Sequence, residues 1–274
     1  MLENCLKKLR ENGALVHNIT NYVTVNDCAN ITIAIGASPI MADEIKEVAD
    51  IQTICGGLNI NMGTLNDRVV ESMLVAGKIA NDLNHPVAFD PVGFAASAYR
   101  TESALRLIDN IQFSVIKGNI SEIKSIATGS KKSFGVDACS DDMVSDSTLK
   151  SVVEFARKLS KSTCAIIVIT GEIDIVSSED KTIIIRNGDS MMSNITGSGC
   201  MLSSLIASFI TANPEDIFES TAAAVVCMGI AGEKAAKKVK DNNLGNTSFR
   251  TYLIDEISKI DARDIKEKGK YERF

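Results

Sequence analysis

Short apolar runs alternate with longer segments of helical pattern along most of this chain, and this alternation limits the fold more than any other feature. Such runs indicate buried strands, and strands joined by crossover helices form a parallel sheet, so the pattern predicts an α/β fold. The expected strands are Ala14–His17, Ile51–Ile54, Val87–Asp90, Phe113–Ile116 and Ala165–Thr170, with a hairpin of Ile173–Val176 and Thr182–Ile185. The expected helices are 22–35, 64–84, 101–109, 119–127, 146–160, 199–211, 215–238 and 248–259, and the lysine-rich end Ile265–Lys270 is expected to be a solvated tail.

The size and charge of the chain narrow the class of protein. Of its 274 residues 45% are hydrophobic, and no Pro- or Ser-rich linker divides them, so we expect one domain over residues 1–274. A net charge of −6 argues against nucleic acid and acidic membrane surfaces as partners, because both select basic patches. The N-terminus lacks the apolar core of a signal peptide, and no apolar run is long enough to span a bilayer. We therefore expect a cytoplasmic protein that acts on small molecules.

The cysteines do not form a recognisable framework. All seven, at positions 5, 28, 55, 139, 164, 200 and 227, lie outside any Cys-x-x-Cys pair, and their number is odd. This distribution predicts neither a set of disulfides nor a zinc site. Most of them, such as Cys164 in front of an apolar run, are expected to be small core residues. Cys200 is the exception.

A glycine-rich turn, Thr196–Cys200, runs directly into the apolar helical pattern that starts at Met201. Glycines permit a tight turn that aims successive backbone N–H groups at one place, and the helix dipole adds partial positive charge there. Residues 197–200 therefore predict an anion site, with Gly199 among the phosphate-binding residues. Cys200 stands at its mouth, where a helix N-terminus favours the thiolate, so it is a candidate base or nucleophile.

Residue spacing excludes three other glycine-rich motifs in this chain. A dinucleotide fingerprint needs a third glycine or an alanine where Leu202 stands. A Walker A loop needs Ser or Thr after Gly-Lys, but Gly77-Lys78 is followed by Ile79. A serine nucleophile elbow needs glycines two residues before and two after the serine, and Ser198 has neither.

Further polar side chains follow the expected strands at their carboxyl ends, where open α/β sheets bind ligands. They are Asn21, Asp90, Lys117 with Glu122, and Thr170. Each of them alone is equally compatible with a turn, a cap or a surface charge. Together with the anion turn they supply what phosphoryl transfer needs: carboxylates for hydrated magnesium, a cation for phosphate oxygens, N–H groups for developing charge, and a base. Asn21 is kept as a candidate neighbour of the substrate.

At this point the chain resembles the hydroxyethylthiazole kinases, thiamine-salvage enzymes of the ribokinase-like superfamily, over nearly its whole length. The matching segments are His17–Asn21, Ser38–Ala42, Leu58–Gly63, Asp90–Gly93, Gly118–Glu122, Thr170–Glu172 and Thr196–Cys200. The last segment discriminates best, since related sugar and vitamin kinases carry aspartate where Cys200 stands. The resemblance implies a three-layer α/β/α sandwich with a mostly parallel central sheet.

The resemblance also implies an activity, which is the ATP- and Mg²⁺-dependent phosphorylation of the hydroxyl of 4-methyl-5-(2-hydroxyethyl)thiazole. The roles that it implies are general base for Cys200, thiazole binding for Met41 and Gly197, ATP binding for Lys117 and Thr170, and magnesium binding for Glu122 and Asp90. The family is trimeric, with the substrate pocket at a subunit interface, so the resemblance implies a homotrimer as well.

The chain departs from the family pattern at two places, and three alternatives to the kinase remain open. Lys117 stands where the family usually has arginine, and Phe94–Ser97 replaces a further glycine and threonine. One alternative is a dehydratase of the same superfamily that uses ATP or ADP to repair hydrated nicotinamide nucleotides, against which Cys200 argues. Others are a thiol hydrolase with His17 or His85 as base, and a nucleotide-binding protein without catalysis.

Overall fold

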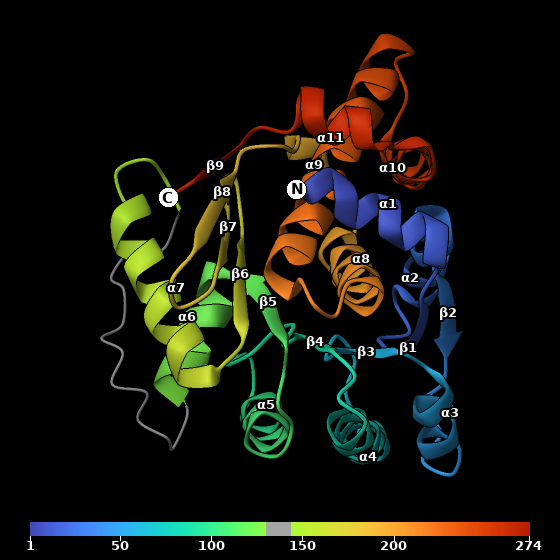
Figure 1. Ribbon diagram of the computed structural model, residues 1–274, viewed down its shortest axis with the longest axis vertical. Coiled ribbons are helices and arrows are strands. Elements are labelled where there is room, and N and C mark those ends of the chain that lie inside the picture. Colours follow the sequence, from blue (N-terminus) through green and yellow to red (C-terminus); the bar gives the residue numbers. More distant parts are fainter. Residues whose placement is uncertain (130–143) are drawn as a thin grey trace.

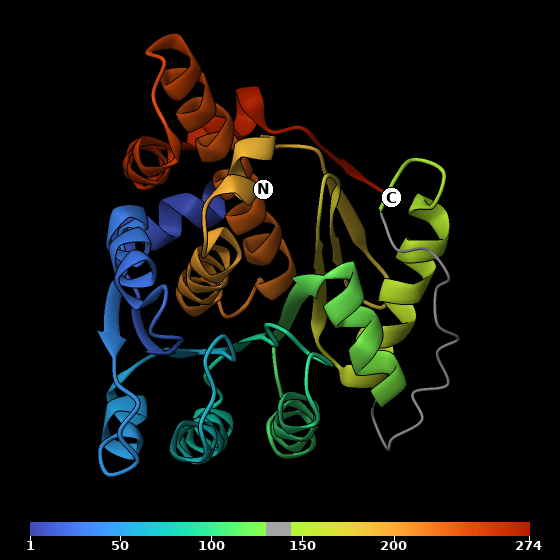
Figure 2. The same ribbon diagram turned by 180° about the vertical axis from the view of Figure 1, so that it is seen from behind.

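The computed structural model describes residues 1–129 and 144–274, so Cys139 lies outside the described residues. Within them, one sheet of nine strands runs in the order β2-β1-β3-β4-β5-β6-β7-β8-β9. The strands from β2 to β6 pair in parallel, and β7, β8 and β9 continue the sheet antiparallel. Helices cover both faces, as the two opposite views show (Figure 1, Figure 2). The prediction of an α/β sandwich with a mostly parallel central sheet is confirmed.

The strands are short. They are β1 Leu15–Ile19, β2 Ser38–Met41, β3 Gly57–Asn61, β4 Val87–Asp90, β5 Val115–Asn119, β6 Ile166–Thr170, β7 Asp174–Ser177, β8 Thr182–Ile185 and β9 Tyr271–Arg273. The predicted hairpin near residues 173–185 is confirmed as β7 and β8.

The helices divide between the two faces (Figure 1). One face carries α1 (Leu2–Asn12), α2 (Val25–Ile35), α8 (Ser198–Ala212) and α9 (Ile217–Asp241), with α10 (Asn246–Lys259) and α11 (Ala262–Lys268) outside them. The other carries α3 (Val48–Ile54), α4 (Asp67–Asp82), α5 (Ala98–Asn110), α6 (Ile120–Gly129) and α7 (Leu149–Thr163). A short 3₁₀ turn, η1 (Ser190–Asn194), precedes α8. All eight predicted helices are present, with boundaries shifted by a few residues.

Each face of the sheet has its own hydrophobic core. Successive side chains of a strand point to opposite faces, so Ile167 and Ile169 of β6 pack into one core and Val168 into the other. This explains why a central strand is apolar at every position.

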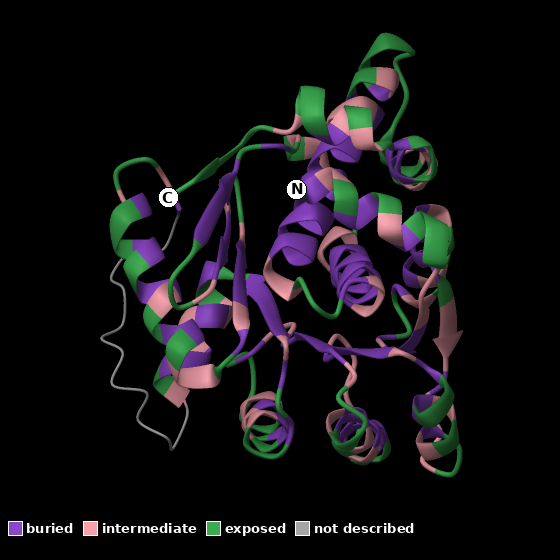
Figure 3. Cartoon of the chain, viewed as in Figure 1, coloured by how far each residue is buried: buried purple, intermediate pink, exposed green. Residues whose placement is uncertain are grey.

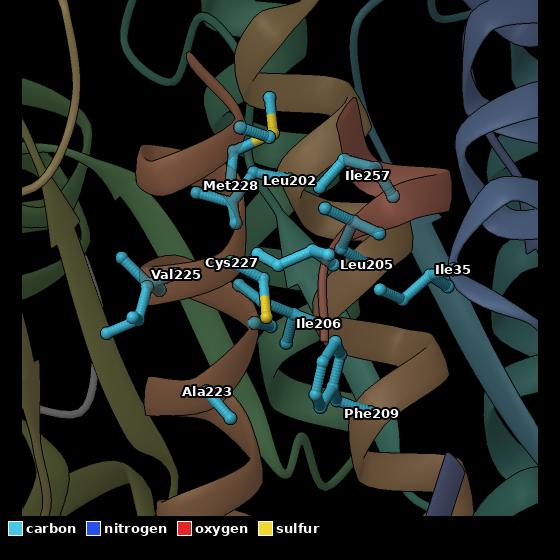
Figure 4. Close-up of a cluster of buried hydrophobic side chains, with 14 of the residues drawn as sticks. Ile35, Leu202, Leu205, Ile206, Phe209, Ala223, Val225, Cys227, Met228 and Ile257 are labelled. Carbon is cyan, nitrogen blue, oxygen red and sulfur yellow. The ribbon is translucent and has the colours of Figure 1, made fainter. Parts of the chain in front are cut away.

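Helix α8 lies at the centre of the second core (Figure 3). Leu205, Ile206 and Phe209 of α8 pack against α9 residues such as Ala223 and Cys227 (Figure 4). A helix that is apolar on all sides is a core helix, and burial on this scale holds the first turn of α8 in place. The glycine-rich turn therefore sits on a rigid support.

The predicted strand Ile51–Ile54 is wrong, because these residues form the end of α3. β-Branched residues favour strands, but here Val48 and Gln52, four residues apart, bury one face of a helix while Ile54 is exposed. The strand of this region is β3, Gly57–Asn61, and edge strand β2 was not predicted either.

Two expectations about single segments are also wrong. Cys164 is exposed, because it ends α7 in a left-handed conformation with φ of 54° and so lies outside the core. The lysine-rich end is not a solvated tail, since Ile265 is fully buried and α11 begins with a capping box of Asp261 and Asp264. Charge alternation on this segment marks the outer face of a docked helix.

No helix in the described parts of the chain combines the length and apolar character needed to cross a membrane.

Candidate active site

The first turn of α8 carries Cys200 into the middle of the molecule. Gly197 precedes the helix with φ of 87°, a conformation that favours glycine. A Cβ atom at Gly197 would also lie 2.4 Å from Cγ2 of Thr24, so a side chain does not fit there. The Cys200 side chain is 9% exposed, and its sulfur lies 3.3 Å from the Nδ2 of Asn21. The structure thus places two predicted substrate neighbours, Asn21 and Gly197, beside the predicted base.

Asp90 lies fully buried at the end of β4 and holds three donors on one oxygen. Its Oδ2 accepts hydrogen bonds from Lys117 Nζ at 3.1 Å, Asn61 Nδ2 at 2.9 Å and Ser203 Oγ at 2.5 Å. Lys117 also donates to the carbonyl oxygen of Gly199 at 3.1 Å. These bonds join the ends of β3, β4 and β5 to the first turns of α8.

Lys117 is buried and remains a cation. Burial disfavours its charge, yet the negative charges around it, that of Asp90 first among them, raise the pKa of the ammonium above its ordinary value. A fixed cation therefore lies directly behind the glycine-rich turn, where it adds to the positive end of the α8 dipole.

Glu122 reaches the site through the loop after β4. Its Oε1 accepts the N–H of Gly93 at 2.8 Å, and its Oε2 accepts the N–H of Asn119 at 2.9 Å. Asn119 Oδ1 accepts the N–H of Glu122 in return, at 2.9 Å. This reciprocal pair caps α6 and ties the Asp90–Gly93 loop to the end of β5.

A cavity of about 1040 Å³ opens beside the turn. Thr170 and Gly199, both predicted to bind ATP, lie on its wall, while Leu202, Val225 and Met228 give it an apolar side. A cavity of this size, with an apolar wall and polar groups at one end, suits an aromatic base that carries phosphates.

Asp174, at the start of β7, also lines this cavity. One carboxyl oxygen accepts the N–H of Gly171 at 2.9 Å. Burial raises the pKa of Asp174 to about 7, and neither this hydrogen bond nor the charge of Lys117 reverses the shift. Sequence reasoning did not select Asp174.

Met41 takes no part in the hydrogen bonds that connect Asp90 to Cys200. It ends edge strand β2, where it is in register with Asn18 of β1, and its side chain is half-buried. The histidines do not serve as partners of the thiol, because the ring of His17 is bonded to Gln52 at 3.1 Å and to the carbonyl of Ala42 at 2.9 Å. His85 lies on the far side of Gln52. This arrangement leaves the thiol hydrolase without its base.

The donor set fits a weakly held hydrated cation better than a caged metal. Within residues 1–129 and 144–274, no group of three or more His, Cys, Asp or Glu side chains could hold a metal ion. Yet Asp90 Oδ1 is buried and has no hydrogen-bond partner among the described residues. Magnesium in kinases keeps several waters and takes only one or two carboxylates besides phosphate oxygens, so Asp90 meets this requirement.

Two residues of the cluster, Asn61 and Ser203, were missed as site residues. Asn61 belongs to a strand in which Asn59 and Asn61 alternate with Leu58 and Ile60. This period of two was the available signal, because it places polar side chains on one face of a strand. Ser203 lies in an apolar segment that predicts a core helix, and nothing in its sequence context indicates a site residue.

Comparison with known proteins identifies the family of this chain. The model of the hydroxyethylthiazole kinase family matches residues 6–263. Hydroxyethylthiazole kinase of Clostridium acetobutylicum is 52% identical to this chain over all of both chains. The chain belongs to the hydroxyethylthiazole kinase family.

Solved structures agree at the level of the fold. The hydroxyethylthiazole kinase protein of Pyrococcus horikoshii has a TM-score of 0.87 at 30% identity, covering 100% of this chain and 98% of that one. A ribokinase-like superfamily protein of Enterococcus faecalis has a TM-score of 0.60 at 13% identity, covering 94% and 89%. The fold of this kinase is therefore ribokinase-like, as the sequence motifs implied.

Proposed function

We propose that this kinase transfers the γ-phosphoryl group of ATP to the primary hydroxyl of 4-methyl-5-(2-hydroxyethyl)thiazole, with Cys200 as general base. One observation carries the proposal: the first turn of α8 holds a buried thiol next to Gly199, whose carbonyl accepts from Lys117 of the Lys117–Asp90 pair, and a large cavity lies beside this turn. This arrangement suits phosphoryl transfer, in which positioning and electrostatics supply most of the acceleration. The alternative of a dehydratase that repairs hydrated nicotinamide nucleotides loses its support, because the chain belongs to the hydroxyethylthiazole kinase family.

In the proposed reaction each residue acts on a stated atom. The Cys200 sulfur takes the proton of the acceptor hydroxyl as the hydroxyl oxygen attacks the γ-phosphorus, and the bond from that phosphorus to the β,γ-bridging oxygen breaks, so that ADP leaves. Backbone N–H groups of residues 198–200 stabilise the negative charge that develops on the phosphoryl oxygens. The positive charge of Lys117 adds to this stabilisation. Thr170 and Gly199 hold the nucleotide phosphates at the mouth of the cavity.

Asp90 and Glu122 are the carboxylates that we propose for magnesium. The unpartnered Oδ1 of Asp90 is available for a water of the hydrated ion, and Glu122 lies one loop away on the same side. Bound magnesium would neutralise the charge of the β- and γ-phosphates. In this proposal, the role of Asp90 and Glu122 is to position the ion.

We also propose a cytoplasmic homotrimer with active sites at the subunit interfaces. Tyr22 and Val23, which follow Asn21 directly, are exposed, and so is Ile33 on the outer side of α2. Met41, with Gly197 a proposed thiazole contact, ends the edge strand. A partner that covers this region would complete the thiazole pocket without any change in the cluster around Cys200.

Substitution of Cys200 tests the proposed function. Cys200→Asp is expected to keep substantial kinase activity, because aspartate accepts a proton equally well, whereas Cys200→Ala should lose roughly 10²–10⁴-fold in kcat. A nucleophilic thiol would tolerate neither change. The measurement is ATP-dependent phosphorylation of the thiazole alcohol at saturating magnesium, with intact-mass analysis for an adduct on the thiol. A folded Cys200→Asp protein as inactive as Cys200→Ala, or a covalent adduct, would exclude the base assignment.

A further inference from the structure

Two buried asparagines connect the carboxylate of Asp90 to the sulfur of Cys200. Asn61 Nδ2 donates to Asp90 Oδ2 at 2.9 Å, and Asn61 Oδ1 accepts from Asn21 Nδ2 at 2.8 Å. Asn21 Nδ2 lies 3.3 Å from Cys200 Sγ. Both asparagines are at most 2% exposed, so no solvent replaces these bonds. The nitrogen and oxygen of an asparagine amide differ in what they offer to a sulfur, and the way each amide faces can be decided from its neighbours.

The amide of Asn61 is fixed from both ends. A carboxylate paired with Lys117 only accepts, so the NH₂ group of Asn61 must face Asp90. The backbone N–H of Gly63, which only donates, lies 2.9 Å from the other end and requires an oxygen there. Asn61 therefore presents its oxygen to Asn21.

The amide of Asn21 is fixed in the same way. Its Oδ1 accepts from the backbone N–H of Thr24 at 3.1 Å and from the hydroxyl of Thr24 at 3.1 Å. Its NH₂ group must then face Asn61 Oδ1 with one hydrogen, which leaves the second hydrogen for the sulfur of Cys200. Gly63 shapes the seat, because a Cβ atom there would lie 2.5 Å from Cγ of Asn21.

We propose that Asn61 is a positioning residue for the reaction: it sets the direction of the Asn21 amide so that an N–H of Asn21 always donates to the Cys200 sulfur. A hydrogen bond donated to the sulfur holds the proposed proton acceptor in one position. The inference rests on the proposed function, in which Cys200 is the base. It adds that the charge of Asp90 acts on this base through two amides.

A double-mutant cycle tests the proposal. Asn61→Leu removes the three side-chain hydrogen bonds of Asn61, to Asp90, Asn21 and Gly63, with little change in volume, and it is made in the native chain and in Cys200→Ala. The matched control is Asn59→Leu, on the same face of β3, which is equally buried but donates to Asn18 and Ser204 at 3.0 and 3.1 Å. The measurement is kcat and KM for ATP and for the thiazole alcohol.

If Asn61 acts through the sulfur, Asn61→Leu lowers kcat by about tenfold or more when Cys200 is present, which is the scale of one or two lost hydrogen bonds. In the Cys200→Ala background, the same substitution lowers kcat by less than about twofold. Asn59→Leu lowers kcat by one and the same factor in both backgrounds. Equal losses for Asn61→Leu in both backgrounds would overturn the positioning role and leave the base assignment standing. A full kcat in Cys200→Ala alone would instead overturn the base assignment, and this inference with it.

Asn21→Asp supplies a second variant in case Asn61→Leu does not fold. It keeps the oxygen that faces Thr24 and replaces the NH₂ group that donates to Asn61 Oδ1 and to the sulfur. The readout does not need turnover: the rate of iodoacetamide labelling of Cys200, followed by peptide mass mapping, with the exposed Cys164 as internal reference. We expect labelling of Cys200 relative to Cys164 to fall about tenfold in Asn21→Asp, whereas an unchanged ratio would contradict donation to the sulfur.

Discussion

A single oxygen of Asp90 organises the candidate site at the residue scale. Lys117, Asn61 and Ser203 all donate to Oδ2, so the carboxylate cannot rotate without breaking three bonds. These bonds also fix the direction of Oδ1, which has no hydrogen-bond partner among the described residues. A fixed carboxylate oxygen of this kind suits a ligand of a hydrated cation. A buried carboxylate in such a network resists substitution, because removal of one partner leaves a charge uncompensated.

Glu122→Gln should separate binding of magnesium from support of the loop. The carboxylate holds the N–H groups of Gly93 and Asn119, and an amide can accept only one of them. We expect the magnesium dependence of the rate to shift to higher concentration, since an amide attracts a hydrated cation less than a carboxylate does. Steady-state rates over a magnesium titration decide the matter. A lower thermal midpoint with an unchanged titration curve would mean that Glu122 only caps α6 and braces the loop.

Lys117 tests the nucleotide side of the same cluster. Lys117→Ala should raise KM for ATP more than KM for the thiazole alcohol, by a factor that corresponds to about 1.5–3 kcal/mol for one charge-assisted contact. Lys117→Arg is the matched control, because it keeps the charge beside Asp90 and should retain ATP binding. Equal changes in both KM values would place Lys117 in the support of Asp90 rather than in contact with phosphates.

At the scale of elements, the sequence predicts helices better than it predicts strands. Helices such as α8 and α9 have long apolar patterns, and every predicted helix is confirmed. Strand β3 was not predicted because Asn59 and Asn61 are typical turn residues, yet both are buried in the sheet, where Asn59 donates to Ser204 of α8 and Asn61 donates to Asp90 of β4. Hydrogen bonds between distant segments stabilise such a strand, and the residues next to it in the sequence do not reveal those bonds.

The hairpin that starts at Asp174 predicts a pH effect. The folded-state pKa of Asp174 is raised to about 7 from its ordinary 3.8, so between about pH 4 and pH 7 the folded chain holds a proton that the unfolded chain has lost. The stability that this group contributes is full below pH 4 and is lost as pH rises toward and through 7. Asp174→Asn should therefore raise the thermal midpoint over the native chain by more at pH 8 than at pH 5.

Glu172→Gln is the control for this measurement, since Glu172 is exposed on the same loop. In Asp174→Asn itself, the amide oxygen that replaces the carboxyl oxygen would keep the hydrogen bond from the N–H of Gly171. We expect Glu172→Gln to change the midpoint by the same small amount at both pH values. An equal gain from Asp174→Asn at pH 5 and pH 8 would show that its carboxyl titrates as an ordinary aspartate.

At the scale of the whole molecule, the polar cluster lies where both cores meet the carboxyl ends of the parallel strands. The motifs predicted this meeting point, because segments far apart in the chain end at one edge of a parallel sheet. They did not predict which side chains touch: Asn21, Asp90, Lys117 and Cys200 form one network, whereas Met41 stands outside it. Thr170 and Gly199 both line the cavity.

Assembly is the property that belongs to the whole molecule. The two apolar segments near 22–35 and 199–211 differ sharply, because α8 is buried within the chain while Tyr22 is 79% and Ile33 60% exposed. Large exposed apolar side chains beside a site are typical of a protein interface, and we expect Tyr22 and Ile33 to lie between the subunits of the proposed trimer.

Ile33→Glu should break the trimer, because it would bury a carboxylate without a partner in each interface. Leu83→Glu is the matched control: Leu83 is an exposed leucine at the end of α4, on the opposite face of the sheet. Sedimentation velocity at micromolar concentration should give a trimer for the native chain and Leu83→Glu, and a monomer for Ile33→Glu. The monomer should show a larger increase in KM for the thiazole alcohol than in KM for ATP relative to the native chain, since only the alcohol pocket needs the partner. A native chain that sediments as a monomer at concentrations where it is fully active would contradict both the trimer and the shared pocket.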